Sequence, residues 1–178
     1  MPCLRDWRQT SWRRTIRLVE GPEILSRHRA SIEAEIRGAL PTGDAPLDEM
    51  IRYQMGWTRD GLMSLGKWLR PALCLTACEA LGGDVHRCLP VAASIEMVHN
   101  FSLIHDDIED GDEVRHHRPA LWSVYGRGPA IAAGTALWTL AYQTLSQAGE
   151  RGLAPDRVLA ARRLLNDCLL YTSPSPRD

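Results

Sequence analysis

The sequence predicts an all-α fold, and two observations carry that prediction. Apolar residues recur at spacings of three and four through most of the chain, and no useful length alternates with the period of a strand. Three of the predicted helices, around residues 69–81, 90–105 and 129–149, are apolar on most sides. A helix of that kind must be buried between neighbours. We therefore expect a bundle of closely packed helices.

Helical periodicity begins at Pro22, and further helices are expected in order along the chain. Pro22, Pro129 and Pro155 suit first turns, while Gly82-Gly83 is a typical helix end. The predicted helices cover residues 22–40, 47–55, 69–81, 90 into the acidic cluster described below, 129–149 and 156–166. Residues 56–66 are expected to form a loop with helical fragments, and residues 111–128 a loop with a short helix.

Length and composition describe one globular domain. The chain has 178 residues, of which 44% are hydrophobic and 24% charged, and its net charge of −1 gives no reason to expect nucleic acid or an anionic membrane as partner. The longest apolar runs, residues 71–77 and 131–142, are too short to span a bilayer. The five cysteines lack disulfide or zinc spacing. We expect reduced thiols in a cytoplasmic protein.

Residues 1–21 form a basic N-terminal extension in which Trp7 and Trp12 lie among arginines. No apolar stretch follows of the kind a secretory signal needs. A surface amphipathic helix, a targeting-like extension and translated sequence upstream of the true start are all compatible with this composition. A solvated tail is the interpretation we favour.

The most informative segment is Asp106–Glu113, where six of eight residues are acidic directly after the apolar run Ile95–His105. Carboxylates at the C-terminal end of a buried helix face the negative pole of its dipole and repel one another. A cation would relieve both effects. Asp106, Asp107 and Asp110 have the spacing D-D-x-x-D, in which positions i and i+4 share a helix face and suit Mg²⁺. A solvated helix end gives the same pattern by chance about as often.

A second constellation makes the metal interpretation stronger. Lys67 and Arg70 lie in Gly-Lys-Trp-Leu-Arg-Pro, where a loop enters a helix whose N-terminus favours an anion. Each alone would be an ordinary surface cation. Together with three cations near the acidic cluster they outline two anion pockets, one bridged by metal and one bound directly: His99, Arg115 and Arg118.

These motifs in this order resemble the isoprenyl diphosphate synthases, the head-to-tail trans-prenyltransferases of the polyprenyl synthetase family. The resemblance covers residues 22–167 and implies the N-terminal half of the isoprenoid synthase helical bundle. It implies that an allylic prenyl diphosphate is condensed with isopentenyl diphosphate, and that the full-length protein is a homodimer. By resemblance, Asp106, Asp107 and Asp110 hold Mg²⁺ against the allylic diphosphate, which Arg115 also contacts. Isopentenyl diphosphate would be bound by Lys67, Arg70, His99 and, in the place of a second arginine, His116.

Two positions depart from the family pattern. His116 falls where the family has the second arginine of Arg-Arg-Gly-x-Pro, and histidine is only partly charged near neutrality. Arg118 is a candidate substitute, and a structural role for it is equally compatible with the sequence. Thr135 follows Gly134 where the family has Gly-Asp. A weakened polar contact between helices and an error in the sequence are both compatible with this difference.

Phe101 and Ser102 lie five and four residues before Asp106. In the family, a bulky side chain at these positions limits the pocket for the growing chain. The pattern predicts geranylgeranyl diphosphate as product, with farnesyl diphosphate as the alternative. An ordinary aromatic of the core is an equally simple interpretation of Phe101.

The second aspartate-rich motif of the family is absent, and the chain ends in an unexpected peptide. Residues 168–178 match the in-frame translation of a transposon adaptor used to prepare sequencing libraries. We expect a gene fragment that ends near Asp167, followed by an artefact, and no turnover from the 178-residue polypeptide. Two alternatives stay open for the intact protein: a non-catalytic partner subunit of a heteromeric synthase, and a class I terpene cyclase.

Overall fold

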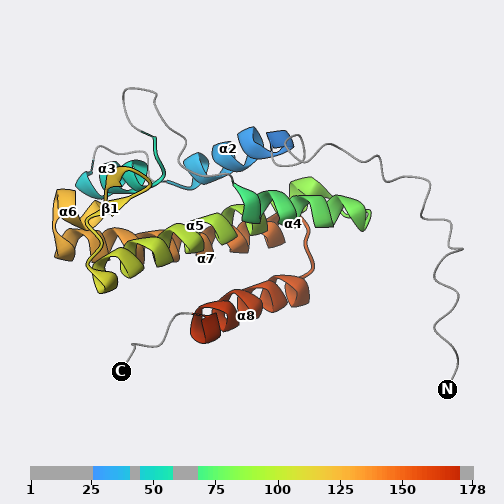
Figure 1. The fold of residues 1–178 in the computed structure, drawn as a ribbon. Coiled ribbons are helices and arrows are strands. Elements are labelled where there is room, and N and C mark those ends of the chain that lie inside the picture. The colour runs from blue at the N-terminus through green and yellow to red at the C-terminus, as the bar shows by residue number, and fades with distance from the viewer. Residues whose placement is uncertain (1–25, 41–44, 58–67, 173–178) are drawn as a thin grey trace, which may run out of the picture.

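Two long helices, α5 (Val85–Asp110) and α7 (Arg127–Glu150), lie alongside each other through the middle of the molecule (Figure 1). The computed structural model describes residues 26–40, 45–57 and 68–172, with side chains up to residue 169. The remaining helices are α2 (Arg29–Ala39), α3 (Pro46–Gln54), α4 (Leu69–Ala80), α6 (Leu121–Tyr125) and α8 (Pro155–Thr172). The predicted all-α class is confirmed.

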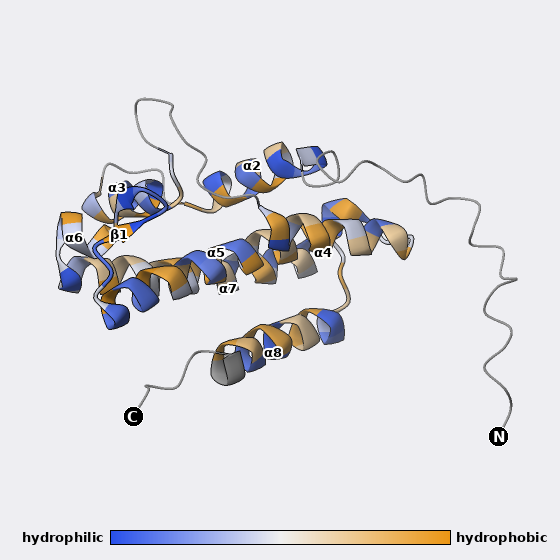
Figure 2. Cartoon of the chain, viewed as in Figure 1, coloured by the Kyte–Doolittle hydropathy of each residue, from blue (hydrophilic) through white to orange (hydrophobic). Residues whose placement is uncertain are grey.

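The core lies where α2, α4 and α7 pack against α5. Met97 and Ile104 of α5 and Leu137 of α7 are almost completely buried. Figure 2 shows α2 as hydrophobic toward α4 and α5 and hydrophilic on its outer side, as expected of a helix that covers a core. The same packing makes α5 a rigid support for the acidic residues at its C-terminal end.

α5 begins at Val85, five residues before the predicted start at Pro90. The Asp84 side chain caps the helix by accepting the backbone N–H of His86 at 2.9 Å. Pro90 therefore lies inside the helix, where it has no N–H for the His86 carbonyl. Arg151, at the C-terminal end of α7, donates to that carbonyl at 3.3 Å and also pairs with Glu35 of α2 at 2.6 Å.

The predicted loop after the acidic cluster contains a short antiparallel hairpin of β1 (Val114–Arg115) and β2 (Arg118–Pro119). Gly111 ends α5 with a φ of 72°. His116 and His117, the two turn residues, have φ values of 51° and 64°. Two left-handed residues in a two-residue hairpin loop are the pattern of a type I′ turn. Strands of two residues are too short to show any period in the sequence.

α8 packs against α7 and continues to Thr172, beyond the predicted end at residue 166. The boundary expected at Asp167 therefore falls inside a helix. Among the described residues, no helix has both the length and the hydropathy that a membrane crossing requires. The basic extension, the start of the first predicted helix, residues 58–66 and Lys67 lie outside the described residues.

Candidate functional site

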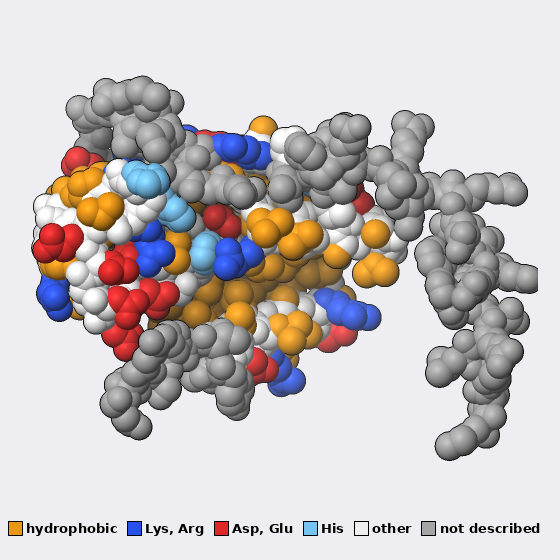
Figure 3. Space-filling model, in the orientation of Figure 1, with side chains coloured by type: hydrophobic (Ala, Val, Ile, Leu, Met, Phe, Trp, Pro, Cys, Tyr) orange, Lys and Arg blue, Asp and Glu red, His pale blue; other side chains and the backbone are white. Residues whose placement is uncertain are grey.

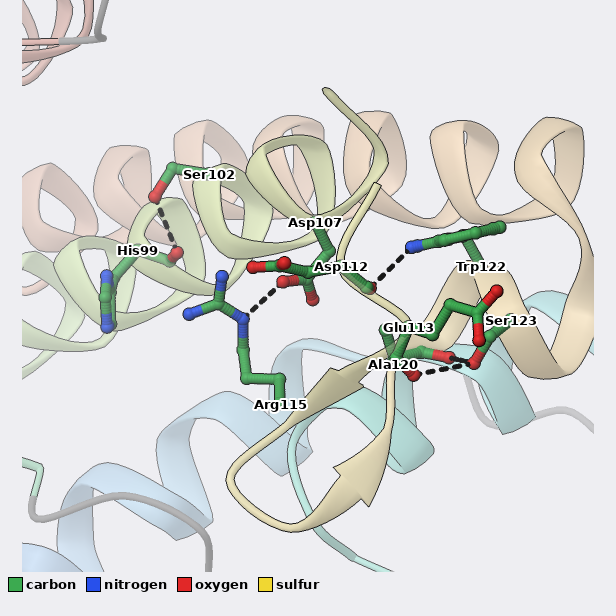
Figure 4. A network of polar contacts seen from close by, with 9 residues as sticks. All are labelled: His99, Ser102, Asp107, Asp112, Glu113, Arg115, Ala120, Trp122 and Ser123. Carbon is green, nitrogen blue, oxygen red and sulfur yellow. Dashed lines mark hydrogen bonds and ion pairs between the residues drawn. The ribbon is translucent and has the colours of Figure 1, made fainter. Parts of the chain in front are cut away.

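Asp106 and Asp107 occupy the last turns of α5 but point in different directions, because neighbouring helical residues are rotated by about 100°. Asp107 is only 2% exposed, and its Oδ1 accepts the Nε–H of Arg115 at 2.5 Å (Figure 4). The hairpin brings Arg115 to this position from β1. Asp107 thus forms an ion pair with Arg115, while Asp106 is half-buried on another side of the helix.

Burial raises the pKa of both aspartates. For Asp107 the Arg115 guanidinium opposes this increase, and the nearby carboxylates of Asp112 and Asp106 add to it. For Asp106, burial and the carboxylate of Asp110, one helical turn away, raise the pKa, while the Arg115 guanidinium lowers it. The pKa of Asp106 as a result lies above the ordinary value for aspartate. A bound cation between Asp106 and Asp110 would remove the repulsion between them.

A cationic cluster lies beside the acidic residues. The Arg70 guanidinium of α4 donates to Nε2 of His99 on α5 at 3.1 Å. Burial, together with the charges of Arg70, Arg115 and His116, lowers the pKa of His99 to about 4. Since Nε2 accepts, the neutral imidazole carries its proton on Nδ1. The structure thus brings together four of the five residues expected to bind substrate diphosphates: Arg70, His99, Arg115 and His116.

His99, Arg115 and His116 line a small pocket of about 90 Å³ with both polar and apolar walls, whereas Arg70 lines a larger cavity described below. The small pocket is also lined by Glu96, Asn100 and Asp107 among others. Burial raises the pKa of Glu96, although Arg70 and an Nδ2–H donated by Asn100 at 3.4 Å favour its charged form. The sequence prediction did not include Glu96. Glu96 could have been identified from the sequence, because it is the one acidic residue within the apolar run 95–105.

Arg118 has a structural role in this arrangement. Its guanidinium donates to the backbone carbonyl of Tyr53 and lies 3.7 Å above the centre of the Tyr53 ring. The Tyr53 hydroxyl donates in turn to the carbonyl of Pro119 at 2.8 Å. Arg118 therefore fastens the hairpin to α3, which favours the structural alternative for this residue over substitution for a second arginine.

A larger cavity of about 720 Å³ lies on another side of α5, between α5, α7 and α8. Apolar and aromatic side chains line it, with polar groups at the end near Asp106: Phe101, Ser102, His105, Asp106, Trp138 and Leu165 are among its walls. Phe101 stacks on Trp138 with ring centres 5.7 Å apart and planes 18° from parallel. Ser102 donates its hydroxyl to the carbonyl of His99 at 2.8 Å (Figure 4).

The space-filling view shows the same arrangement on one face (Figure 3). Acidic, basic and histidine side chains gather beside the hairpin, and a hollow lined by hydrophobic side chains opens next to them. A charged patch that borders an apolar hollow fits a ligand with an anionic head and a hydrocarbon tail.

α5 and α7 approach each other closely at Gly134. A Cβ atom at this position would lie 2.7 Å from the His105 ring. The buried Nε2 of His105 has no hydrogen-bond partner among the residues that the structure describes. Thr135 donates its hydroxyl to the Ile131 carbonyl of its own helix at 2.9 Å. Thr135 is exposed and bonds within its own helix, so the effect expected at this position on a helix–helix contact stays a prediction.

The described residues contain no group of three or more His, Cys, Asp or Glu side chains close enough to hold a metal ion. Of the three aspartates in the motif, Asp107 faces Arg115, and Asp106 and Asp110 form a pair one turn apart. A pair of carboxylates is sufficient for Mg²⁺, which keeps several waters and takes phosphate oxygens as further ligands. The donor set therefore fits Mg²⁺ through Asp106 and Asp110.

Comparison with known protein families decides the relationship. Residues 57–173 match the model of the polyprenyl synthetase family. The chain belongs to this family. The matched segment contains the acidic motif, the cationic cluster and the aromatic pair, so the geometry above is that of a polyprenyl synthetase domain.

Individual relatives agree with this assignment. The chain is 41% identical over 155 residues to a geranylgeranyl diphosphate synthase of Mycobacterium tuberculosis, covering 84% of this chain and 43% of the relative. It is 43% identical over 106 residues to a (2E,6E)-farnesyl diphosphate synthase of the same species, covering 57% of this chain and 30% of the relative. This chain spans less than half the length of these relatives.

Solved structures show the same partial match. A geranylgeranyl pyrophosphate synthetase from the archaeon Geoglobus acetivorans is 31% identical with a TM-score of 0.71, over 83% of this chain and 45% of that one. A polyprenyl synthetase from Streptomyces coelicolor is 36% identical with a TM-score of 0.66, over 84% of this chain and 47% of that one. The described helices therefore form part of the prenyl synthase bundle.

Proposed function

We propose that the intact protein catalyses head-to-tail prenyl transfer, condensing isopentenyl diphosphate with an allylic prenyl diphosphate. One observation carries the proposal: the Arg70–His99 pair and Asp106 line one largely apolar cavity, with Arg115 and Asp110 close to Asp106. Cations would bind two diphosphates while the cavity accepts a hydrocarbon chain. We further propose that the full-length protein works as a homodimer.

Asp106 and Asp110 would hold Mg²⁺ and orient the allylic diphosphate toward the cavity. When bound, Mg²⁺ neutralises charge on the departing diphosphate and so promotes ionisation of the allylic C–O bond. The apolar walls would exclude water from the allylic cation. Asp107 would act indirectly, because its ion pair positions Arg115 at 2.5 Å.

Lys67, Arg70, His99 and His116 would bind isopentenyl diphosphate. The His99 imidazole accepts from Arg70 at Nε2, so its Nδ1–H is available to a phosphate oxygen. A bound dianion would also offset the cationic charges that lower the pKa of His99. The double bond of isopentenyl diphosphate then attacks the allylic cation, and a proton leaves to the released diphosphate.

Phe101 would limit product length from its place in the cavity wall. Its stacking on Trp138 holds the ring across the space that a growing chain would enter from Asp106. We propose geranylgeranyl diphosphate as the product, with farnesyl diphosphate as the alternative. Phe101→Ala should lengthen the product, and an unchanged product would remove Phe101 as the limiting residue.

The decisive experiment starts from the coding sequence beyond Asp167. Amplification of the source locus across this junction should show a longer reading frame with a second aspartate-rich motif, whereas a natural stop codon just after codon 178 would contradict the fragment hypothesis. The restored protein should elongate an allylic diphosphate with labelled isopentenyl diphosphate only when Mg²⁺ is present. Asp106→Asn should reduce this rate at least about a hundredfold, and Glu150→Gln, at an exposed position at the end of α7, should not.

The same assay separates the alternatives. A cyclic hydrocarbon formed from the allylic diphosphate alone would identify a terpene cyclase. No elongation by the restored protein alone, with activity recovered on adding a second synthase subunit, would identify a non-catalytic partner. Elongation by the 178-residue chain itself would show that no further segment is needed for activity.

A further inference from the structure

Three cysteines gather where α4 meets the first turn of α5, outside the proposed substrate site. Cys74 and Cys78 lie one turn apart on α4, and Cys88 faces them from α5. The sulfur atoms of Cys74 and Cys88 are 3.8 Å apart, and all three side chains are half-buried. Gly83 in the connecting turn lies against Cys78, because a Cβ atom there would come within 2.7 Å of its sulfur.

The geometry of the pair is close to that of a cross-link. A disulfide bond is about 2.0 Å long, so the sulfurs at 3.8 Å must approach by roughly 1.8 Å. Rotation of two short side chains with a small shift of the helices supplies such a movement. The two residues are 14 positions apart in adjacent, directly connected helices, so no other element has to move.

The hydrogen bonding distinguishes the three thiols chemically. Cys74 and Cys88 share a hydrogen bond in which either thiol can be the donor, and this bond favours the thiolate of the accepting sulfur. Burial and the neighbouring Cys88, Asp84 and Glu79 raise the pKa of Cys78 to about 11. The thiolate is the reactive form of cysteine. Cys74 and Cys88 are therefore the reactive pair of the cluster, and either of the two can supply the attacking thiolate.

We propose that Cys74 and Cys88 form a reversible disulfide with a low-molecular-weight disulfide of the glutathione type as oxidant. The thiolate of one of the two cysteines attacks one sulfur of the oxidant, forms a mixed disulfide and releases one thiolate. The other cysteine then attacks the protein sulfur of the mixed disulfide and releases the second thiolate. The two protein thiols are oxidised, the oxidant is reduced to two thiols, and the protons of Cys74 and Cys88 go to the two leaving sulfurs.

The cross-link would join the two helices that carry the Arg70–His99 pair. Cys74 is one helical turn from Arg70, and Arg70 contacts His99 at 3.1 Å. A bond between α4 and α5 at this level restricts any change in their spacing. The inference concerns the thiols alone and stands whether or not the protein is a prenyltransferase.

The test uses the 178-residue chain and oxidised glutathione. After exposure in native buffer and alkylation in denaturant, the protein should show two fewer of its five thiols, and peptide mapping should find Cys74 joined to Cys88. Dithiothreitol should reverse the change. Five free thiols, a Cys78–Cys88 cross-link, or glutathione retained on Cys74 would each overturn the proposal.

A matched variant keeps the test independent of other thiols. Cys3→Ser/Cys78→Ser/Cys168→Ser leaves only the proposed pair. Its cross-linking should be at least about tenfold faster in native buffer than in concentrated urea, because only the fold holds the sulfurs in contact. Its oxidised form should also unfold at a higher urea concentration than its reduced form. Equal rates in the two solvents, or equal unfolding midpoints, would show that the fold does not prepare this bond.

Discussion

The two pockets beside α5 differ in size, lining and construction. The pocket of about 90 Å³ has polar and apolar walls, is bordered on one side by the hairpin, and has the Asp107–Arg115 pair in its wall. The cavity of about 720 Å³ is largely apolar and lies between helices. Asp106 faces the cavity and Asp107 the pocket, although they are neighbours in the chain.

The difference shows how carboxylates within one helical turn come to lie in different surroundings. A rotation of about 100° per residue sends consecutive carboxylates to different surroundings. Asp107 therefore stabilises the hairpin, whereas Asp106 and Asp110 stay available for a cation. The three aspartates of the motif therefore have different surroundings, with Asp107 in an ion pair and Asp106 and Asp110 outside it.

Among the variants that test this comparison, Arg115→Ala should have the largest effect on the free energy of unfolding. The variant removes the partner of Asp107, a carboxylate only 2% exposed, and should lower the free energy of unfolding by about 3 kcal/mol. Urea denaturation measures the loss. Arg157→Ala, at an exposed position of α8, is the control and should change stability by less than about 0.5 kcal/mol. Equal effects of the two variants would show that the ion pair contributes little.

Gly134→Ala tests the apolar side. The new methyl group would lie 2.7 Å from the His105 ring, so the variant should lose about 2 kcal/mol through overpacking between α5 and α7. Thermal unfolding followed by circular dichroism is the measurement. Gly38→Ala on α2 has nothing within 4 Å of the added carbon and should instead be stabilising by about 0.5 kcal/mol. A neutral Gly134→Ala would mean that the two helices can separate without cost.

The free energy of unfolding should depend on pH through His99, which lines the smaller pocket. Its folded pKa is about 4, below the ordinary value of 6.5, so the unfolded state binds more protons between these values. Stability from this group is present above about pH 6.5 and is lost as the pH falls toward 4, by about 1 kcal/mol after allowance for solvent screening. His99→Gln should remove this part of the slope in denaturation curves recorded at several pH values. An unchanged slope would contradict the lowered pKa.

The smallest expected effect is at the hairpin turn. His117 has a φ of 64°, which costs a residue with a Cβ atom about 1 kcal/mol relative to glycine. His117→Gly should therefore raise the unfolding free energy by up to about 1 kcal/mol. The control is His86→Gly in the first turn of α5, where glycine should be destabilising. A destabilised His117→Gly variant would show that the imidazole makes contacts that outweigh its backbone strain.

Much of the architecture could be predicted from apolar spacing. The helices around 47–55, 69–81 and 129–149 are present with ends shifted by at most two residues, because their flanking prolines and glycines agree with their apolar periodicity. The start of α5 was placed wrongly, since Pro90 looks like a first-turn proline while Asp84 is the actual cap. Local signals compete in such a segment, and packing against α4 and α7 decides between them.

The site was predictable as a set of residues but not as an arrangement. The motifs identified Arg70, His99 and Arg115, and the structure brings them together. That Asp107 turns to Arg115 depends on a hairpin whose strands are too short to detect in the sequence. The roles of these residues in binding metal and diphosphates stay predictions.

Pro90 gives the bundle a coupling that no sequence period reveals. Pro90 leaves the His86 carbonyl without its helical donor. The Arg151 guanidinium, 65 residues away in the chain, donates to this carbonyl and also to the Glu35 carboxylate. One guanidinium thus links α2, α5 and α7. In a double-mutant cycle, Pro90→Ala should make Arg151→Ala less harmful, since the restored N–H competes for the same carbonyl. A hydrogen bond that is missing within α5 is thus replaced by a contact that restrains α2, α5 and α7 relative to one another.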